Sequence, residues 1–241
     1  MKLLAFRIFG DYAHFRKFYT TSSPLTFSFP PPPTIRGIVG AIMGFGKDEY
    51  LEETKNLWIG IKIDKPLKKI RMGLNLVDTK NYPIFKPPWK RPKSKAIQRT
   101  QVKAEFLKES SFTLYLYSED ELTQELYSLI REHKTHYTVS LGLSELLADF
   151  ELVGIFEAEK VKSSEYVNSV VPVNVVKELN LERPQKIGKE RIPMHMDVDR
   201  KVLKYEDVIF SMEGKPIYGT ITEVYKLSNG EAVWLWKPPQ R

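Results

Sequence analysis

The sequence predicts an α+β protein. A ferredoxin-like βαββαβ domain is expected over residues 1–160, with a basic hairpin inserted at 80–103, followed by a small antiparallel β-rich region over 161–241. Three observations support this fold class. Strand-like and helix-like patterns alternate in that order up to residue 160, one long segment lacks acidic residues, and the later sequence consists of short apolar runs separated by turn residues.

The first strand is expected at residues 2–9, KLLAFRIF, which are mostly apolar and too few for an isolated helix. The two-residue alternation of a strand places Leu4, Phe6 and Ile8 on the face toward the helices. The opposite face receives Arg7. We therefore expect that face to be partly open or the arginine to be paired.

A helix is expected after the prolines at 30–33, which cannot continue a helix or a ladder and so form a stiff extended lead into it. Thr34 is expected as the N-cap, and the helix is expected to end near Gly44 or Gly46. One stripe of this helix carries almost no side chain, and its members are Gly37, Gly40, Ala41 and Gly44.

The stripe of small residues predicts that another group approaches the helix closely. One interpretation is a helix packed tightly on a sheet. The other adds a phosphate bound at the helix start, where free N–H groups near Ile35 and the side chain of Arg36 would form a positive end. The two interpretations are compatible.

The remaining elements follow from similar patterns. Strands are expected at 57–64, from 68 onward, at 112–117 and around 151–159. A helix is expected to begin at Ser118 with Glu121 in a capping box. Its buried stripe is expected to consist of Leu122, Leu126, Leu129 and Ile130.

The segment from Lys80 to Lys103 has eight lysines and arginines and no acidic residue. Aromatic residues and four prolines are interleaved with these bases, so the segment cannot bury enough apolar surface to fold alone. We expect it to project as a mobile hairpin or loop. Its cations suit phosphates, and a ring such as Trp89 can stack on or wedge between bases. A solvated basic loop is the alternative.

A second cluster of rings and bases lies at residues 12–19, YAHFRKFY. Half of these rings should belong to the core. His14, Arg16 and Lys17 are candidates for contacts with an RNA backbone, and Phe15 or Tyr19 for contact with the face of a base.

The composition excludes several classes of function. Lysine and arginine total 37 against 30 aspartates and glutamates, which gives a net charge of +7 and favours a polyanionic partner. The chain has no cysteine, which excludes disulfides, thiolate zinc sites and cysteine nucleophiles and makes the cytoplasm the default location. No apolar run is long enough to span a membrane. No metal or cofactor site is expected.

Residues 11–46 resemble the amino-terminal signature of the CRISPR-associated protein 5 family of the RAMP superfamily. The matching positions are Phe15, Arg16, Tyr19, Thr20, the turn at 24–26, Phe29 with the prolines, Thr34, Ile35, Arg36, Gly37, Gly40 and Gly44. A spaced series of this kind is far more specific than a single short motif.

The resemblance implies a ferredoxin-like domain whose amino-terminal loop and glycine-striped helix cradle the 5′ handle of the guide RNA. It also implies a basic thumb-like hairpin that crosses the RNA, to which 80–103 corresponds by position and composition. The implied function is a non-catalytic crRNA-binding subunit of a type I Cascade complex. Such a subunit caps the 5′ handle, docks onto the large and backbone subunits, and meets target DNA only indirectly.

The residues expected to contact RNA are His14, Phe15, Arg16, Lys17, Tyr19, Thr34, Arg36, Trp89, Lys90, Arg91, Lys93, Lys95, Arg99 and Arg191.

Two other classes of function stay open at the level of sequence. One subtype of the family cuts precursor RNA, and a metal-independent ribonuclease would need a general acid and base such as histidine or tyrosine. His14, His195, Tyr12 and Tyr19 are present, but they form no recognisable constellation. The other class is a general RNA-binding module, which would bind RNA that lacks a repeat sequence.

Overall fold

The computed structural model describes residues 1–77 and 99–238 of the 241-residue chain. Its first part contains β1 (Lys2–Ala13), α1 (Pro32–Met43), α2 (Tyr50–Glu53), β2 (Trp58–Ile63), β3 (Lys68–Val77), β4 (Arg99–Tyr117), α3 (Leu122–Arg131) and β5 (Asp149–Val167). Its second part contains β6 (Val171–Pro172), a 3-10 turn (Val173–Val175), β7 (Val176–Leu179), β8 (Ile187–Met196), β9 (Val202–Ser211), β10 (Ile217–Leu227) and β11 (Ala232–Val233).

The predicted α+β class is confirmed. An eight-stranded sheet has the order β11-β10-β5-β1-β4-β2, with β3 also paired to β4 and β7 to β10. All of these pairs are antiparallel. A three-stranded sheet has the order β6-β9-β8. The strands expected at 2–9, 57–64, from 68 onward, at 112–117 and around 151–159 are present, and the first and the last two lie within longer strands.

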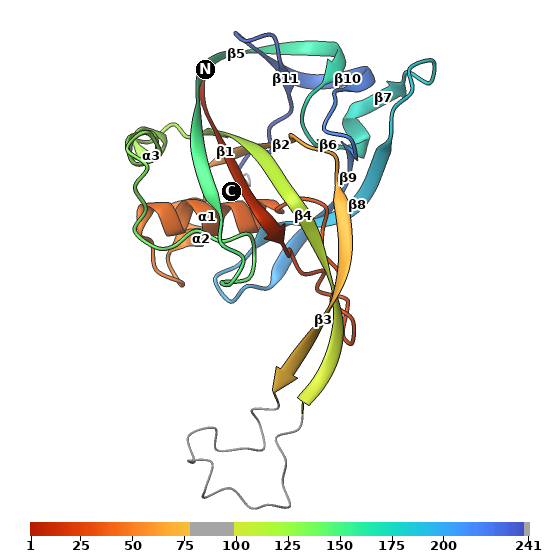
Figure 1. Ribbon diagram of the computed structural model, residues 1–241. Helices are drawn as coiled ribbons and strands as arrows, with labels where there is room; N and C mark the ends of the chain where they lie inside the picture. The colour runs from red at the N-terminus through yellow and green to blue at the C-terminus, as the bar shows by residue number, and fades with distance from the viewer. Residues whose placement is uncertain (78–98, 239–241) are drawn as a thin grey trace, which may run out of the picture.

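The helices α1 and α3 cover one face of the large sheet, and the C-terminal strands cover part of the other (Figure 1). As predicted, Leu4, Phe6 and Ile8 of β1 point into the core that also contains the apolar side chains of α1 and α3. Leu3 and Ala5 point the other way, into a cluster with residues of β10 and β11. The alternation of β1 therefore determines which face receives the helices.

Both predicted helix starts need correction. The N-cap of α1 is Pro31, not Thr34, because the prolines at the first two helical positions have a backbone angle already suited to a helix. The helix α3 begins at Leu122 without the capping box, since the hydroxyl of Ser118 donates to Asp120 instead. The predicted end of α1 near Gly44 is confirmed. The last helical residue is Met43, and the C-cap Gly44 has a left-handed φ of 89°.

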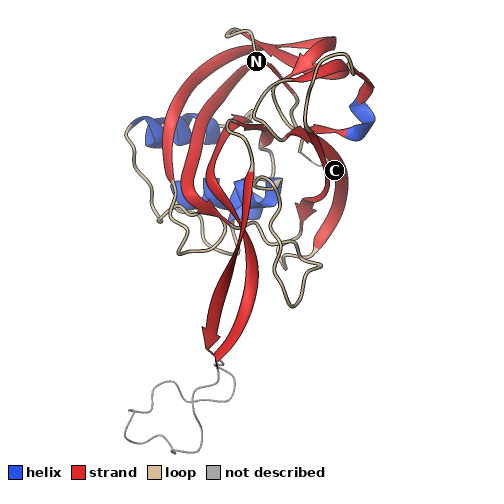
Figure 2. Cartoon of the chain, turned by 45° about the vertical axis from the view of Figure 1, so that its right-hand side comes forward, coloured by secondary structure: helices blue, strands red, loops and turns tan. Residues whose placement is uncertain are grey.

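The strands β3 and β4 form a long two-stranded arm that extends away from the body (Figures 1 and 2). Their register runs from Lys68 opposite Lys108 to Val77 opposite Arg99. Of the basic insertion predicted at 80–103, residues 99–103 belong to this arm as part of β4. Residues 80–98, with Trp89, Lys90, Arg91, Lys93 and Lys95, lie outside the described residues.

The domain boundary predicted at residue 160 falls inside β5. Residues 149–157 of this strand pair with β1, and residues 158–167 pair with β10. The region after residue 160 therefore extends the same sheet and adds the three-stranded sheet. The division into two domains stays a prediction.

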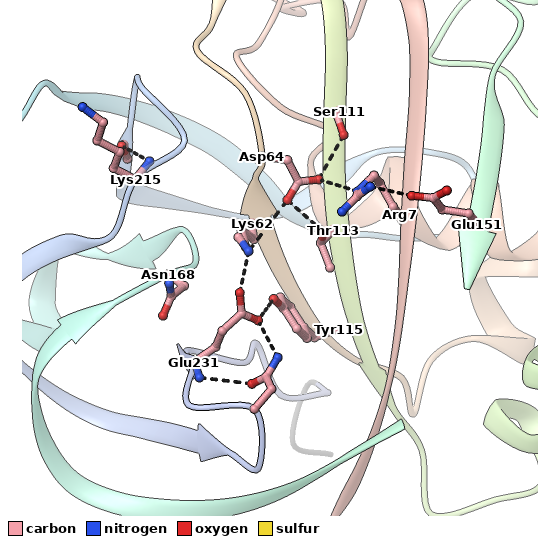
Figure 3. A network of polar contacts seen from close by, with 12 residues as sticks. Arg7, Lys62, Asp64, Ser111, Thr113, Tyr115, Glu151, Asn168, Lys215 and Glu231 are labelled. Carbon is pink, nitrogen blue, oxygen red and sulfur yellow. Dashed lines mark hydrogen bonds and ion pairs between the residues drawn. The ribbon is translucent and has the colours of Figure 1, made fainter. Parts of the chain in front are cut away.

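A polar network on the helix-free face joins the C-terminal strands to the sheet (Figure 3). The carboxylate of Glu231, in the turn before β11, accepts hydrogen bonds from Tyr115 and Lys62 at 2.5 Å each. Asp64 accepts hydrogen bonds from Ser111 at 3.0 Å and Thr113 at 2.8 Å, and lies 3.6 Å from Arg7. Arg7 also pairs with Glu151 at 2.5 Å, which agrees with the expectation that this arginine is paired or its face partly open.

These contacts change the ionisation of the buried groups. Burial raises the pKa of Glu231, but hydrogen bonds from Lys62 and Tyr115 outweigh burial and hold the pKa below its ordinary value. Burial, together with the neighbouring charge of Glu231, raises the pKa of the Tyr115 hydroxyl, which stays neutral. Glu231 therefore stabilises the folded chain as a carboxylate.

We predict that Glu231→Gln lowers the free energy of unfolding by about 1–3 kcal/mol at pH 7, because hydrogen bonds to a charged group are lost. A lowered pKa means that this contribution is complete above the unfolded pKa of about 4.3 and is lost as the pH falls through the folded pKa. The check is urea denaturation of both proteins at pH 7 and pH 3.

The difference in unfolding free energy between the two proteins should shrink at pH 3. Glu119→Gln, at an exposed glutamate, is the control and should change little at either pH. An equal loss for Glu231→Gln at both pH values would contradict the role of the carboxylate charge.

Candidate nucleic-acid interface

A groove of about 450 Å³ lies between the N-terminal loop, the outer side of α1, the segment at 138–143 and the turn between β8 and β9. Along α1, it is lined by Thr34, Gly37, Ile38 and Ala41, so two of the four positions in the predicted small-residue stripe face it. A Cβ added at Gly37 would meet only the ring of Tyr50, at 3.8 Å. A ligand can therefore approach the helix backbone closely here.

The other two glycines of the stripe serve packing. A Cβ at Gly40 would lie 2.7 Å from the Cβ of Tyr50, so α2 can cross α1 at this point only over a glycine. Gly44 has the left-handed conformation that ends the helix, and its N–H donates to the carbonyl of Gly40 at 2.8 Å. The predicted close packing of the stripe is therefore present at Gly40 and Gly44, although the packing partner at Gly40 is α2 and not a sheet.

The start of α1 is not a phosphate site. Pro32 and Pro33 have no N–H, and the N–H groups of Thr34 and Ile35 both donate to the carbonyl of Pro31, at 2.8 and 3.1 Å. The prediction of free N–H groups near Ile35 is therefore wrong. Pro32 and Pro33 remove two donors, and the carbonyl of Pro31 accepts the next two. Thr34 still lines the groove through its half-buried side chain.

The prediction that Arg36 binds a phosphate is also wrong for this structure. Its side chain is 6% exposed, and one terminal nitrogen donates to the carbonyl of Leu57 at 3.2 Å. Burial lowers its pKa to about 10, which still leaves the guanidinium charged at neutral pH. Arg36 faces the interior, because its helical position lies on the side of α1 that packs on the body.

Two further predicted contacts in the loop are buried. Phe15 is 3% exposed and packs edge to face on Phe112, so its ring has no face open to a base. His14 is 4% exposed, and its Nδ1 is 2.7 Å from the carbonyl of Glu105. Both side chains contribute to the lining of the groove. Because they are almost completely buried, the prediction that they contact RNA directly is wrong.

Lys17 is used to hold the loop in place. Its ammonium donates to Glu190 of β8 at 3.1 Å. The same carboxylate accepts the hydroxyl of Ser28 at 2.8 Å and its N–H at 3.1 Å, and lies 3.6 Å from Lys69 of the arm. Lys69 also lies 3.4 Å from Glu105 of β4. We call Lys17, Lys69, Glu105 and Glu190 the ionic cluster; it joins the loop, the arm and β8, and it leaves Lys17 unavailable to a phosphate.

Four side chains near the ionic cluster contact one another in a row. Arg191 lies over the ring of Tyr205 at 5.8 Å, Tyr205 is 5.0 Å from Phe18, and Phe18 is 5.2 Å from Tyr19. Phe18 and Tyr19 are 54% and 58% exposed. We call these four residues the aromatic row. Of the predicted contacts, the structure thus brings Arg191 and Tyr19 into one row.

Two arginines flank the groove. Arg16 is exposed, and its guanidinium donates to the carbonyl of Thr20 at 3.3 Å. Arg200 is exposed in the turn between β8 and β9, where its φ of 62° is left-handed. Both arginines line the groove, so two separate segments, the N-terminal loop and the turn between β8 and β9, bring positive charge to it. This arrangement can bind an anionic chain that follows the groove.

Sequence reasoning missed three of these residues. Phe18 lies between Lys17 and Tyr19, which were both predicted to contact RNA, so its position in the sequence could have indicated the same role. Tyr205 and Arg200 carry no local signal, because they reach the site only through the pairing of β8 with β9. Arg99 begins β4 in the arm, and the remaining predicted contacts, at 89–95, lie outside the described residues.

The described residues hold no group of three or more His, Asp or Glu side chains arranged to bind a metal. None of the helices in this part of the chain is both long and apolar enough to cross a membrane.

Comparisons with known proteins place the chain in a family. The family model described as CRISPR-associated protein (Cas_Cas5) matches residues 3–207. No curated protein matches the chain. Among solved structures, the chain is similar to a CRISPR protein from Archaeoglobus fulgidus with 15% identity and a TM-score of 0.59, over 98% of this chain and 99% of that one.

A chain of a solved CRISPR RNA-guided surveillance complex is similar with 10% identity and a TM-score of 0.52, over 91% of both chains. At these identities the structural likeness shows a shared fold. The family model spans most of the sequence and includes the glycine-striped helix and the strands that line the groove. The chain therefore belongs to the CRISPR-associated Cas5 family.

Proposed function

We propose that this chain is a non-catalytic crRNA-binding subunit of a type I Cascade complex that caps the 5′ handle of the guide RNA. The observation that carries the proposal is the groove beside α1, which is lined by small residues of that helix and by two exposed arginines and has exposed rings next to it. Membership in the Cas5 family supports the coarser assignment to a CRISPR effector complex.

In this proposal, the RNA backbone lies in the groove against Gly37 and Ala41, with phosphates near Arg16 and Arg200. A helix surface without side chains allows the ribose-phosphate chain to approach the backbone, and the two arginines neutralise its charge. The charges of the ionic cluster pair with one another, so they shape the loop and do not contribute free cations.

We further propose that β1-α1-β2-β4-α3-β5 is a ferredoxin-like unit of the RAMP type. Its elements follow the order strand, helix, strand, strand, helix, strand, and its strands lie together as β5-β1-β4-β2. The arm of β3 and β4 is then an insertion between the second and third strands of that unit, where the thumb of the family is expected.

The proposed partners are the crRNA, the backbone subunits and the large subunit, with target DNA met only through the guide. The cytoplasm is the proposed location. One structural neighbour is a chain of an RNA-guided surveillance complex, which supports an assembly of this kind for the present chain.

The test is to incubate the purified chain with a repeat-containing RNA in EDTA and to run a native gel beside a denaturing gel. The proposal predicts intact RNA that is shifted more strongly than a scrambled control. Equal binding to scrambled RNA would favour a general RNA-binding module. A discrete fragment that begins at the 5′ handle would contradict the non-catalytic assignment, because it would show metal-independent cleavage.

We predict that Gly37→Ala separates stability from RNA binding. The new methyl group has room within the folded chain and removes a helix-interior glycine, so the free energy of unfolding should rise by up to about 1 kcal/mol. The same methyl group projects into the groove. The Kd for repeat RNA should therefore increase by about three- to tenfold, or roughly 1 kcal/mol, by fluorescence anisotropy.

Gly40→Ala is the matched control on the same stripe. Its Cβ would lie 2.7 Å from the Cβ of Tyr50, so this variant should lose stability through strain between α1 and α2. If Gly37→Ala bound RNA as tightly as the wild type, the backbone of α1 would not be in contact with the ligand.

A further inference from the structure

We infer that the aromatic row, Arg191, Tyr205, Phe18 and Tyr19, is a stacking site for unpaired nucleobases of the bound RNA, and that the hairpin of β8 and β9 supplies half of it. The inference deepens the proposed function and rests on it. It adds Phe18 and Tyr205 as base-binding residues and assigns the C-terminal hairpin a direct role in RNA binding.

Two rings of the row are unusually exposed. Phe18 and Tyr19 leave more than half of their side-chain surface in water, next to each other, although the same loop buries Phe15 and Phe27 almost completely. Exposed neighbouring rings are unfavourable for a soluble surface unless a ligand covers them. Rings with an accessible face are the groups on which single-stranded RNA stacks its bases.

The row is also continuous with the groove. Phe18 belongs to the aromatic row and also lines the groove beside Arg16. Arg200 and Val202, which precede Tyr205 in the hairpin, also line it. A strand whose phosphates follow the groove therefore has its bases within reach of the row.

The row carries a positive charge and is held rigidly. The guanidinium of Arg191 lies over Tyr205 at 5.8 Å, within the range of a cation–π contact, and remains exposed to a phosphate. Glu190, next to Arg191, holds Lys17 and Ser28 of the loop. The loop and the hairpin are thus fixed to each other before RNA binds, so the rings need little ordering to accept a base.

The ligand class follows from these features. The row offers aromatic faces and one cation, and this site is expected to accept any base, because every base has a face that can stack. Paired bases are protected within a duplex. The occupant is therefore one or two unpaired bases in a single-stranded part of the RNA, with little preference for their identity.

The experiment measures binding of repeat RNAs that each lack one base, by fluorescence anisotropy in EDTA. For the wild type, one or two abasic positions should raise the Kd about 5- to 150-fold, the range of base–ring stacking. Tyr205→Leu should bind intact RNA more weakly and should no longer respond to those positions. Tyr205→Phe should restore the wild-type pattern, since it keeps the ring.

Tyr19→Leu is the second variant, because Tyr19 lies at the exposed end of the row and its loss should leave the fold intact. Circular dichroism checks folding of each variant. If both leucine variants responded to every abasic position as the wild type does, the inference would be overturned.

Failure of the proposed function would look different. In that case the wild type would bind repeat and scrambled RNA equally, whatever the effect of Tyr205→Leu. An effect of the leucine variants on both RNAs would keep the stacking site and remove the assignment to the 5′ handle.

Discussion

The proposed RNA surface depends on the contacts of one partly buried carboxylate, that of Glu190. It accepts hydrogen bonds from Lys17 and from both donors of Ser28, and it lies close to Lys69 of the arm. A carboxylate this poorly exposed is stable only with such partners. Because those partners come from the N-terminal loop and β3, one side chain of β8 fixes three distant segments together. The aromatic row includes the chain neighbours of this junction, Phe18 and Arg191, so in our proposal the ion pairs shape the site and leave other cations to bind the RNA.

The two faces of the sheet have different roles. The helices pack on one face, and α1 carries the groove on its outer side. The other face is partly covered by β10 and β11 and carries the network of Arg7, Lys62, Asp64 and Glu231, in which each cation is paired with a carboxylate. Paired charges of this kind hold strands together and offer little to a polyanion. In the proposed function, the positive charge offered to RNA is instead that of Arg16, Arg191 and Arg200 on the groove side.

Local sequence patterns were sufficient to predict the α+β class, the glycine-striped helix and which side chains of β1 face the helices. These features depend on periodicity and on neighbours along the chain. The same patterns placed Arg36 and Phe15 on the surface, since sequence does not show which side of a helix or loop faces the body. Lys17 was predicted to bind RNA because its partner, Glu190, is distant in sequence. Tyr205 and Arg200 were missed for the same reason: they join the site through strand pairing, which leaves no local trace.

Ultraviolet cross-linking of the chain to repeat RNA, followed by mass spectrometry of the modified peptides, tests the central claim most directly. We expect cross-links at Phe18, Tyr19 and Tyr205 and in peptides that line the groove, from α1 and from the turn that contains Arg200. Partly exposed aromatic residues that pack on the apolar cluster of the helix-free face, such as Trp58 and Phe156, should remain unmodified. Cross-links confined to that face would contradict the proposed interface, because they would place the RNA on the opposite side of the sheet from the groove.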